Sequence, residues 1–350
     1  MARMGIRDVL LVEAGNYEQF CIGESIPPET KPLFIRLGIF EKFLAEGHEP
    51  CYGSRSYWGD DRRGHNDSLF SVFGHGWHLD RARFNRFIAK EAQAAGVTLI
   101  TRSTFQQCQE LADGRFQLSI DTDQASLRNI KADFVVDATG ALGVFARQQG
   151  CKKRMDRPLI AMGMRFSLKN VSRPISQVTH LEAVEYGWWY AAPLPDDTLM
   201  AMLTTDAKTA KALSLSQSAA WLSHLQDTAN TAQWIADATP VDEAPMNFSV
   251  PSFMLDKVVG RRWMAIGDTA SAYDPITSQG IIKALSDAVF AAETIAPYLH
   301  RQEDKLENYQ RTIAARYQQY LAMRNDFYRI EKRWLQSAFW QRQQAGYGED

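Results

Sequence analysis

Residues 267–281 read GDTASAYDPITSQGI, and this stretch decides how the rest of the chain is interpreted. It follows four apolar residues, 263–266, whose pattern predicts a buried strand. A helical pattern of apolar residues begins at Ile281 and runs to Leu299. The small residues and Pro275 between these two elements favour a turn whose backbone can come close to a ligand. The stretch therefore predicts a strand, a turn and a helix in direct succession.

The polar groups of this stretch lie where a ligand could use them. Asp268 follows the strand, and its carboxylate can accept two hydrogen bonds from the hydroxyl groups of a ribitol or a ribose. Gln279 and Gly280 precede the helix, whose free N–H groups and positive dipole end attract an anionic ring edge. An acid, a proline turn and a helix N-terminus in this order suit a flavin. The alternative is an ordinary strand-turn-helix connection with a capping aspartate.

Composition limits the classes of protein to consider. A chain of 350 residues predicts about two domains or one large one, and its 45% hydrophobic and 23% charged residues are ordinary for a globular enzyme. The formal net charge of −2 indicates no nucleic-acid partner. The four cysteines are scattered, so we expect neither a metal site nor a disulfide framework. No apolar run is as long as a transmembrane helix, and we expect a cytoplasmic protein without membrane contact.

A second strand signal lies near the start of the chain. Residues 8–12 predict a strand, and Glu13 follows it directly. In dinucleotide-binding folds an acid at this place holds the adenosine ribose, about 20 residues after a Gly-rich turn. No such turn precedes Glu13, so we expect the first strand and its Gly-rich loop to lie before Met1. The alternative is that Glu13 is an ordinary acid at a strand end.

The remaining pattern alternates between helices and strands. Helices are expected over 29–37, 40–46, 80–95 and 216–227, with a helical tail over 303–344. The helix over 80–95 is expected to begin with an N-cap acid. Antiparallel strands are expected over 54–58 and 68–73, around a polar turn at 59–66, with a further strand over 132–138 and a hairpin over 103–130. Further strands of an antiparallel sheet are expected over 160–168, 176–182, 187–192, 198–203 and 246–253.

The order of the motifs resembles that of FAD-dependent monooxygenases with the glutathione-reductase-like fold. These motifs are LLVEAG (10–15), GWHLDRARF (76–84), FVVDATG (134–140) and the 267–281 stretch. GESIPP (23–28) and GWWYAAPLP (187–195) are similar to the corresponding motifs of the tryptophan-halogenase-like branch. The resemblance implies an α/β FAD-binding fold with an inserted α+β substrate domain, built mainly on an antiparallel sheet, and a helical C-terminus.

The resemblance also implies a division of the chain. Residues 1–158 would form the first part of the FAD-binding domain, without its first strand and Gly-rich loop. Residues 159–258 would form the substrate domain, and 259–350 the return to the FAD-binding domain with C-terminal helices. The residues expected at the cofactor are Glu13, Gly23, Glu24, Ser25, Arg81, Thr139, Gly140, Gly267, Asp268, Pro275, Gln279 and Gly280.

Each expected cofactor contact has a role in the family and an ordinary structural alternative. Glu13 would hold the adenosine ribose, Asp268 the ribitol, and Pro275 to Gly280 the isoalloxazine ring. Arg81 would face the pyrophosphate with a bidentate guanidinium, or else be a solvated residue of a first helical turn. The backbone at Thr139 would approach the cofactor, or else be a plain strand exit. Residues 23–25 would border the flavin, or else form a capped proline turn.

The groups that halogenases of this branch use are missing. Those enzymes form hypohalous acid from a flavin hydroperoxide and carry a lysine shortly after the GESIPP-like loop. This chain has no lysine between Lys42 and Lys90. They also carry a glutamate inside DPxESTG, where this chain has Thr277. The sequence therefore disfavours halogenation.

Without these groups, the resemblance implies hydroxylation of an aromatic substrate through a C4a-hydroperoxyflavin. The motif set best resembles the LodB/GoxB-like flavoproteins, which mature the cysteine tryptophylquinone of partner amino-acid oxidases, and this implies a peptidyl Trp as substrate. A separate flavin reductase is a further expected partner. The alternatives are a flavin-dependent reductase of isoprenoid chains and an inactive, truncated fragment of the fold.

Four residues are candidates for lining the substrate pocket. Trp188 and Tyr190 alternate on an expected strand, so both face either the flavin or the core. Trp77 and His78 belong to the GWHLDR motif. His78 could act as a general base, but a lone histidine near an aromatic ring is more often structural. No residue of the sequence identifies itself as catalytic.

Overall fold

The computed structural model describes residues 1–68, 71–123, 125–172, 174–300 and 304–345. Three of the described strand pairs are parallel, and two of these join distant parts of the chain outside the large sheet. β1 (Leu10–Val12) pairs with β7 (Thr98–Ile100), and β11 (Val135–Asp137) pairs with β21 (Trp263–Ala265). β20 (Val259–Gly260) adds an antiparallel neighbour to β21. Because ligands bind at the carboxyl ends of parallel strands, β1, β11 and β21 point to the expected site.

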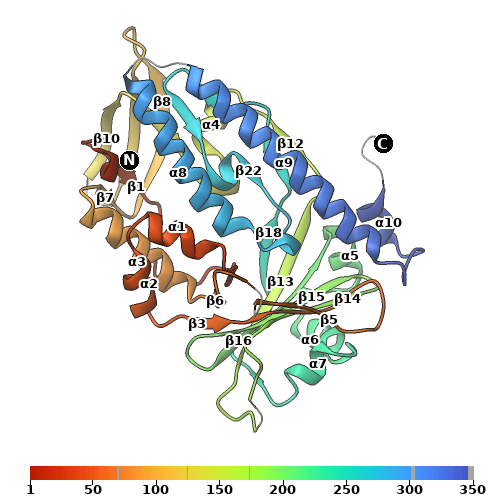
Figure 1. Cartoon of the computed structure of the whole chain (residues 1–350). Helices are drawn as coiled ribbons and strands as arrows, with labels where there is room; N and C mark the ends of the chain where they lie inside the picture. Colours follow the sequence, from red (N-terminus) through yellow and green to blue (C-terminus); the bar gives the residue numbers. More distant parts are fainter. Residues whose placement is uncertain (69–70, 124, 173, 301–303, 346–350) are drawn as a thin grey trace.

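Three helices pack together in the N-terminal third of the chain. α1 (Thr30–Arg36) and α2 (Phe40–Ala45) lie beside α3 (Arg81–Ala94) (Figure 1). Asp80 accepts a hydrogen bond from the Arg83 N–H at 2.9 Å, so the expected N-cap of the third helix is confirmed. The helices share an aromatic core in which the Phe34 and Phe43 ring centroids are 4.5 Å apart.

Three small antiparallel sheets connect these parts. β2 (Ser25–Ile26) and β3 (Glu49–Cys51) flank β6 (Gly76–His78). β9 (Phe116–Thr122) lies between β8 (Ser103–Glu110) and β10 (Ala125–Ala132), so the expected hairpin over 103–130 is extended by a third strand. In the third sheet, β19 (Phe253–Leu255) lies between β12 (Lys153–Met155) and β22 (Ser271–Ala272). The short helical elements of this part are η1 (Ala2–Met4), η3 (Gly140–Leu142) and α4 (Val144–Gln148).

The largest of the described sheets has eight strands. Its strands are β17 (Thr239–Pro240), β13 (Leu159–Ser167), β16 (Thr198–Thr205), β15 (Gly187–Leu194), β14 (Thr179–Val184), β4 (Gly53–Tyr57) and β5 (Gly64–Asp67), with β18 (Met246–Val250) paired to β13. β4 and β14 run parallel, whereas the other pairs are antiparallel. The sheet thus includes strands from outside 159–258, and the domain boundaries stay a prediction.

One sequence expectation about this sheet is wrong. Residues 68–73 were expected to pair with the strand at 54–58, but β4 pairs with β5 instead, and Ser71 to Phe73 lie outside any strand. Residues 69 and 70 lie outside the described residues. All four residues of β5 are exposed, so the strand has no apolar alternation that could reveal it. The apolar residues of 68–73 suggested a strand with a buried face, but Val72 is 91% exposed.

Both faces of the eight-stranded sheet are covered. α5 (Ala207–Ala212), α6 (Ser218–Gln226) and α7 (Thr231–Trp234) pack on one face, where the Trp189 and Trp221 rings are 4.9 Å apart. The C-terminal helices α9 (Asp304–Ile330) and α10 (Ala338–Gln344) cover the other face (Figure 1). α8 (Gly280–Leu299) runs beside α9. None of the described helices is both long and apolar enough to span a bilayer.

Candidate functional site

The 267–281 stretch contains the predicted turn and the start of the predicted helix, but a short strand, β22 (Ser271–Ala272), divides the turn into two. β21 is fully buried and leads into η4 (Gly267–Thr269), where Gly267 adopts a left-handed φ of 57°. Pro275 opens the second turn, η5 (Pro275–Thr277), and the Asp274 side chain caps it. α8 begins at Gly280. The chain thus turns from the buried strand to the N-terminus of a 20-residue helix.

Asp268 extends from the first of these turns and is half-exposed. Its Oδ1 lies 3.0 Å from Nζ of Lys283, a buried residue in the first turn of α8. The same ammonium donates a hydrogen bond to the Ser271 carbonyl. The lysine therefore fixes the position of the carboxylate, while the exposed half of the Asp268 side chain remains accessible to a ligand diol.

The N-terminus of α8 is open. Gln279 provides no side-chain cap, and no atom lies within 4 Å of a Cβ placed on Gly280. The first N–H groups of a helix have no intrahelical acceptors, so an uncapped end with free space above it favours an anionic group. This geometry is compatible with the predicted flavin edge.

The motif at 134–140 lies next to the 267–281 stretch. The Thr269 hydroxyl donates to the Gly140 carbonyl at 2.9 Å, which joins η3 to η4. A Cβ on Gly140 would meet no atom within 4 Å, so this backbone also faces open space. The Thr139 side chain is used locally, because its hydroxyl donates to Asp137 at 2.6 Å. A contact at Thr139 would therefore be made by its backbone, as the sequence predicted.

Glu13 follows the carboxyl end of β1, as expected for a ribose-binding acid. Its Oε1 accepts the Gly15 N–H at 2.7 Å. Burial raises the pKa of the neighbouring Tyr17 to about 12, and the Glu13 carboxylate contributes to the same shift. Glu13 is thus held at a strand end by the Gly15 N–H, and its contact with the adenosine ribose stays a prediction.

Arg81 fixes the loop that contains Gly23. Its Nη1 donates to the carbonyls of Ile22 at 2.7 Å and Gly23 at 3.0 Å. A Cβ on Gly23 would lie 2.4 Å from this nitrogen, which explains the glycine at that position. The buried Nε of Arg81 has no hydrogen-bond partner in the described part of the chain. The structure therefore shows a loop-holding role for Arg81, and the pyrophosphate contact stays a prediction.

Five polar side chains form a network, which we call the relay cluster: Glu24, Ser25, His78, Thr179 and Tyr190. Four of them are buried, and Ser25 is partly buried. The Tyr190 hydroxyl lies 2.9 Å from Ser25 Oγ and close enough to the Glu24 carboxyl to influence its pKa. Ser25 Oγ lies 3.0 Å from Thr179 Oγ1, which lies 3.1 Å from His78 Nε2. The structure thus joins two residues predicted at the cofactor to two predicted in the substrate pocket.

Burial determines the protonation of this cluster. It raises the pKa of the Glu24 carboxyl, and it raises that of the Tyr190 hydroxyl well above its usual value. Burial also lowers the pKa of His78 to about 4. Both tyrosine and histidine are therefore neutral at pH 7, and the carboxyl is biased towards its protonated form.

The two tryptophan candidates are used in packing. Trp188 shares a face of β15 with Tyr190, as predicted, but its Nε1 donates to Tyr328 Oη at 3.1 Å beneath the C-terminal helices. Trp77 packs edge-on against Phe43, with ring centroids 5.2 Å apart. Both indoles are at least 95% buried. Of the four pocket candidates, Tyr190 and His78 are the two that join the polar network.

Sequence reasoning missed two residues that complete these arrangements. Thr179 lies at the start of β14, and only the parallel pairing of β14 with β4 brings it beside the GESIPP loop. Lys283 could have been noticed, because it lies one helical turn after Gly280 and one turn before the buried Asp287. Its ion pair with Asp268 depends on the turn geometry and could not be derived from spacing.

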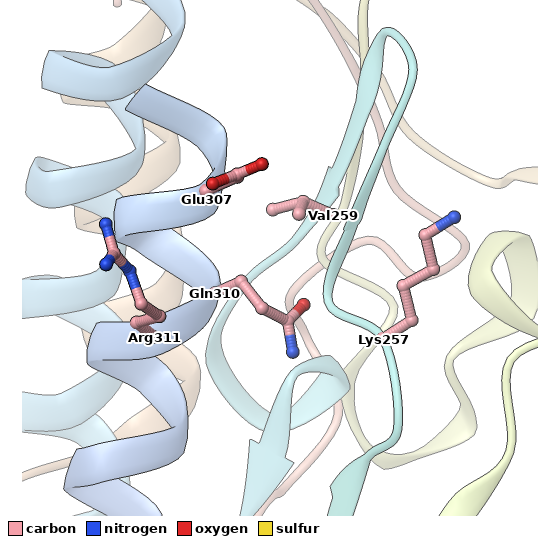
Figure 2. Close-up of a pocket in the computed structure, with 5 residues that line it drawn as sticks. All are labelled: Lys257, Val259, Glu307, Gln310 and Arg311. Carbon is pink, nitrogen blue, oxygen red and sulfur yellow. The ribbon is translucent and has the colours of Figure 1, made fainter. Parts of the chain in front are cut away.

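One surface depression is distant in sequence from most of these motifs. Figure 2 shows it between α9 and the β20 region, with a volume of about 360 Å³. It is lined by Lys257, Val259, Glu307, Gln310 and Arg311. Gln310 is already engaged, since its Oε1 accepts the Val258 N–H at 2.8 Å. This depression contains none of the predicted site residues.

The residues of the site fit an FAD molecule. The free space over Gly140 and Gly280 leaves room for close backbone contact, and the uncapped end of α8 suits an anionic edge. Asp268 presents an accessible carboxylate. The buried Glu24 Oε1 lacks a partner in the described residues. These are the features that a flavin with a ribitol chain would use.

Comparison with known proteins finds FAD-dependent and flavin-dependent relatives. The chain is 28% identical over 341 residues to LodB of Marinomonas mediterranea, which is described as an FAD-dependent oxidoreductase. The match covers 96% of this chain and 90% of LodB. The chain superposes on the flavin-dependent halogenase CmlS with a TM-score of 0.86 at 25% identity, covering 98% of this chain and 64% of the CmlS chain. It also superposes on the peptidyl tryptophan dihydroxylase QhpG with a TM-score of 0.78 at 22% identity, covering 99% and 75%.

These comparisons confirm the predicted α/β fold of flavin-dependent enzymes and the predicted cofactor, FAD. A family model, described as tryptophan halogenase, matches residues 60–349, which is most of the chain. The protein is therefore a flavin-dependent oxidoreductase, and it belongs to the tryptophan halogenase family.

Proposed function

We propose that this chain is an FAD-dependent monooxygenase that hydroxylates an aromatic substrate. The observation that carries the proposal is the absence of the two groups on which halogenation depends in the family. Thr277 stands in place of the halogenase glutamate, and its hydroxyl donates to the Asp274 carbonyl at 3.2 Å. β4, which follows the GESIPP loop and precedes GWHLDR, carries Arg55 between two serines and has no lysine.

Lys283 does not replace the missing lysine. Its side chain is 6% exposed, and Nζ is engaged by the Asp268 carboxylate and the Ser271 carbonyl. A lysine that holds a hypohalous acid needs a free ammonium in the substrate cavity. The ion pair of Lys283 instead supports a role in positioning Asp268.

The chain's own residues would bind, orient and protect the reacting groups. Asp268 would hold the ribitol and the N-terminus of α8 the isoalloxazine edge, whereas Glu13 would hold the adenosine ribose. FAD, once reduced, supplies the chemistry of oxygen activation and transfer. One oxygen atom of O₂ enters an aromatic C–H bond and the other leaves as water, with the consumption of two electrons and two protons.

For the substrate, we propose a tryptophan side chain within a protein. The similarity to LodB extends over almost the whole chain, and QhpG is described as a dihydroxylase of peptidyl tryptophan essential for tryptophylquinone cofactor biogenesis. The electrons would come from a separate flavin reductase.

Reconstitution tests the proposal. The protein would be loaded with FAD, supplied with reduced flavin by a flavin reductase, and incubated with tryptophan-containing peptides from a candidate partner oxidase. We expect oxygen uptake and a peptide mass that increases by one or two oxygen atoms. Protein that binds FAD but yields no oxygenated product with any such peptide would contradict the proposal.

A further inference from the structure

The relay cluster has the composition of a proton pathway. Three of its members, Tyr190, Ser25 and Thr179, are hydroxyl groups, each of which can donate one hydrogen bond while accepting another. They lie in a row between a carboxyl group and an imidazole. The distance is 2.9 Å from Tyr190 Oη to Ser25 Oγ, 3.0 Å from there to Thr179 Oγ1, and 3.1 Å from Thr179 Oγ1 to His78 Nε2. Since either oxygen can be the donor in the two hydroxyl pairs, the row can be oriented in both directions.

Each end of this row has an unsatisfied polar atom. Glu24 is 2% exposed and its Oε1 has no partner, while His78 is fully buried and its Nδ1 has none, both within the described residues. Leaving a buried polar atom unpaired destabilises the folded protein. Two such atoms at opposite ends of one network indicate places where a ligand, a water molecule or a proton is exchanged.

We propose that Glu24, Tyr190, Ser25, Thr179 and His78 form a buried proton relay that serves the flavin site, with Glu24 as its inner end and His78 as its outer end. The proposal rests on the proposed function, because hydroxylation consumes protons and the Gly23–Ser25 loop is the one predicted to border the flavin. Nothing in the sequence pattern assigns Thr179 to this role.

The relay conserves atoms and charge. Glu24 in its acid form gives up the proton of its carboxyl to the reacting centre and becomes a carboxylate. The Tyr190 proton then moves to the carboxylate, the Ser25 proton to Tyr190, the Thr179 proton to Ser25, and a proton from His78 to Thr179. Solvent water supplies one proton to Nδ1 of His78, so one proton enters the relay there and one leaves it at Glu24.

The charged surroundings of Glu24 support its acid form. The groups that face it are the Arg81 guanidinium, the Tyr190 hydroxyl and the Cys21 thiol. Arg81 favours the carboxylate, but burial is the larger influence and raises the Glu24 pKa. Arg81 also uses Nη1 on two backbone carbonyls rather than on the carboxyl. A proton is therefore held at the inner end until it is needed.

Infrared spectroscopy tests the inner end without any turnover. We expect the FAD-loaded protein at pH 7 to show a protonated carboxylic acid band that is absent in Glu24→Gln and shifted in Tyr190→Phe. Tyr186→Phe is the matched control, since it removes a tyrosine hydroxyl at the turn of the same hairpin, where it donates to the His224 carbonyl. Identical carboxylic acid bands in wild type and Glu24→Gln would overturn the relay.

Kinetics tests the continuity of the row. Thr179→Val should lower kcat about tenfold or more, within the range of general acid–base catalysis, while KM and FAD affinity stay unchanged. Thr179→Ser keeps a hydroxyl and should restore kcat and its pH profile, whereas equal activity of the Val and Ser variants would show a packing role and overturn the relay. If the wild type fails to hydroxylate but shows the Glu24 band, the proposed function fails while the assignment of the inner end survives.

Discussion

His78 should make the stability of the protein depend on pH in a defined window. The imidazole is fully buried, and burial lowers its pKa to about 4 from an ordinary value of 6.5. The folded state therefore binds fewer protons than the unfolded state between these two values. The contribution of neutral His78 to the free energy of unfolding is fully present above pH 6.5, and it is lost as the pH falls towards about 4.

The magnitude follows from the shift. One pKa unit corresponds to about 1.4 kcal/mol, so His78 should account for about 3 kcal/mol of lost unfolding free energy between pH 7 and pH 4. His78→Gln keeps a polar group near Thr179 but cannot titrate. We expect the free energy of unfolding of the wild type, relative to this variant, to fall by that amount across the window.

Urea denaturation followed by tryptophan fluorescence at several pH values measures this difference. His48 is present in both proteins, so its own lowered pKa of about 4 cancels in the comparison. His48→Gln serves as the matched control for a second buried histidine. A difference between wild type and His78→Gln that stays constant from pH 7 to pH 4 would refute the reasoning, because His78 would then titrate equally in both states.

Three further substitutions test separate parts of the account. Asp268→Asn should weaken FAD binding about tenfold in a fluorescence titration, because a hydrogen bond to a charged acceptor contributes about 1.5–3 kcal/mol; unchanged affinity would remove Asp268 from the site. Tyr328→Phe should lower the unfolding free energy by about 1–3 kcal/mol, because the Asp274 carboxylate loses a buried donor at 2.8 Å, and an equally stable variant would contradict this. Gly76→Ala should lower the unfolding free energy by more than about 1 kcal/mol, since its Cβ would lie 2.2 Å from the Ile26 carbonyl oxygen. An unfolding free energy equal to that of the wild type would show that β2 and β6 can separate freely.

The fold was largely predictable where apolar patterns were strong. The strand, turn and helix around Asp268 were expected from residues 263–299 and are present. The helix from Arg81 to Ala94 was expected from its apolar face and its capping aspartate. β5 was missed because an exposed polar edge strand has no period-two pattern.

The candidate site was predictable in part. Motif residues such as Gly140 and Asp268 could be placed at strand ends from the sequence, and the structure brings their turns together. The partners of those residues could not be predicted, because Thr179 and Lys283 reach Ser25 and Asp268 through strand pairing and turn geometry. Arg81 illustrates the same limit, since its contacts with the loop carbonyls depend on where α3 packs.

The most direct test of the central claim is a competition between oxygen and halide in one reaction. The FAD-loaded protein, a flavin reductase and a tryptophan-containing peptide would be incubated with isotopically labelled O₂ and an excess of bromide, and the peptide analysed by mass spectrometry. We predict labelled oxygen on the indole and no bromine, because Thr277 and β4 lack the glutamate and the lysine that halogenases of this branch use. Brominated peptide without labelled oxygen would contradict the account.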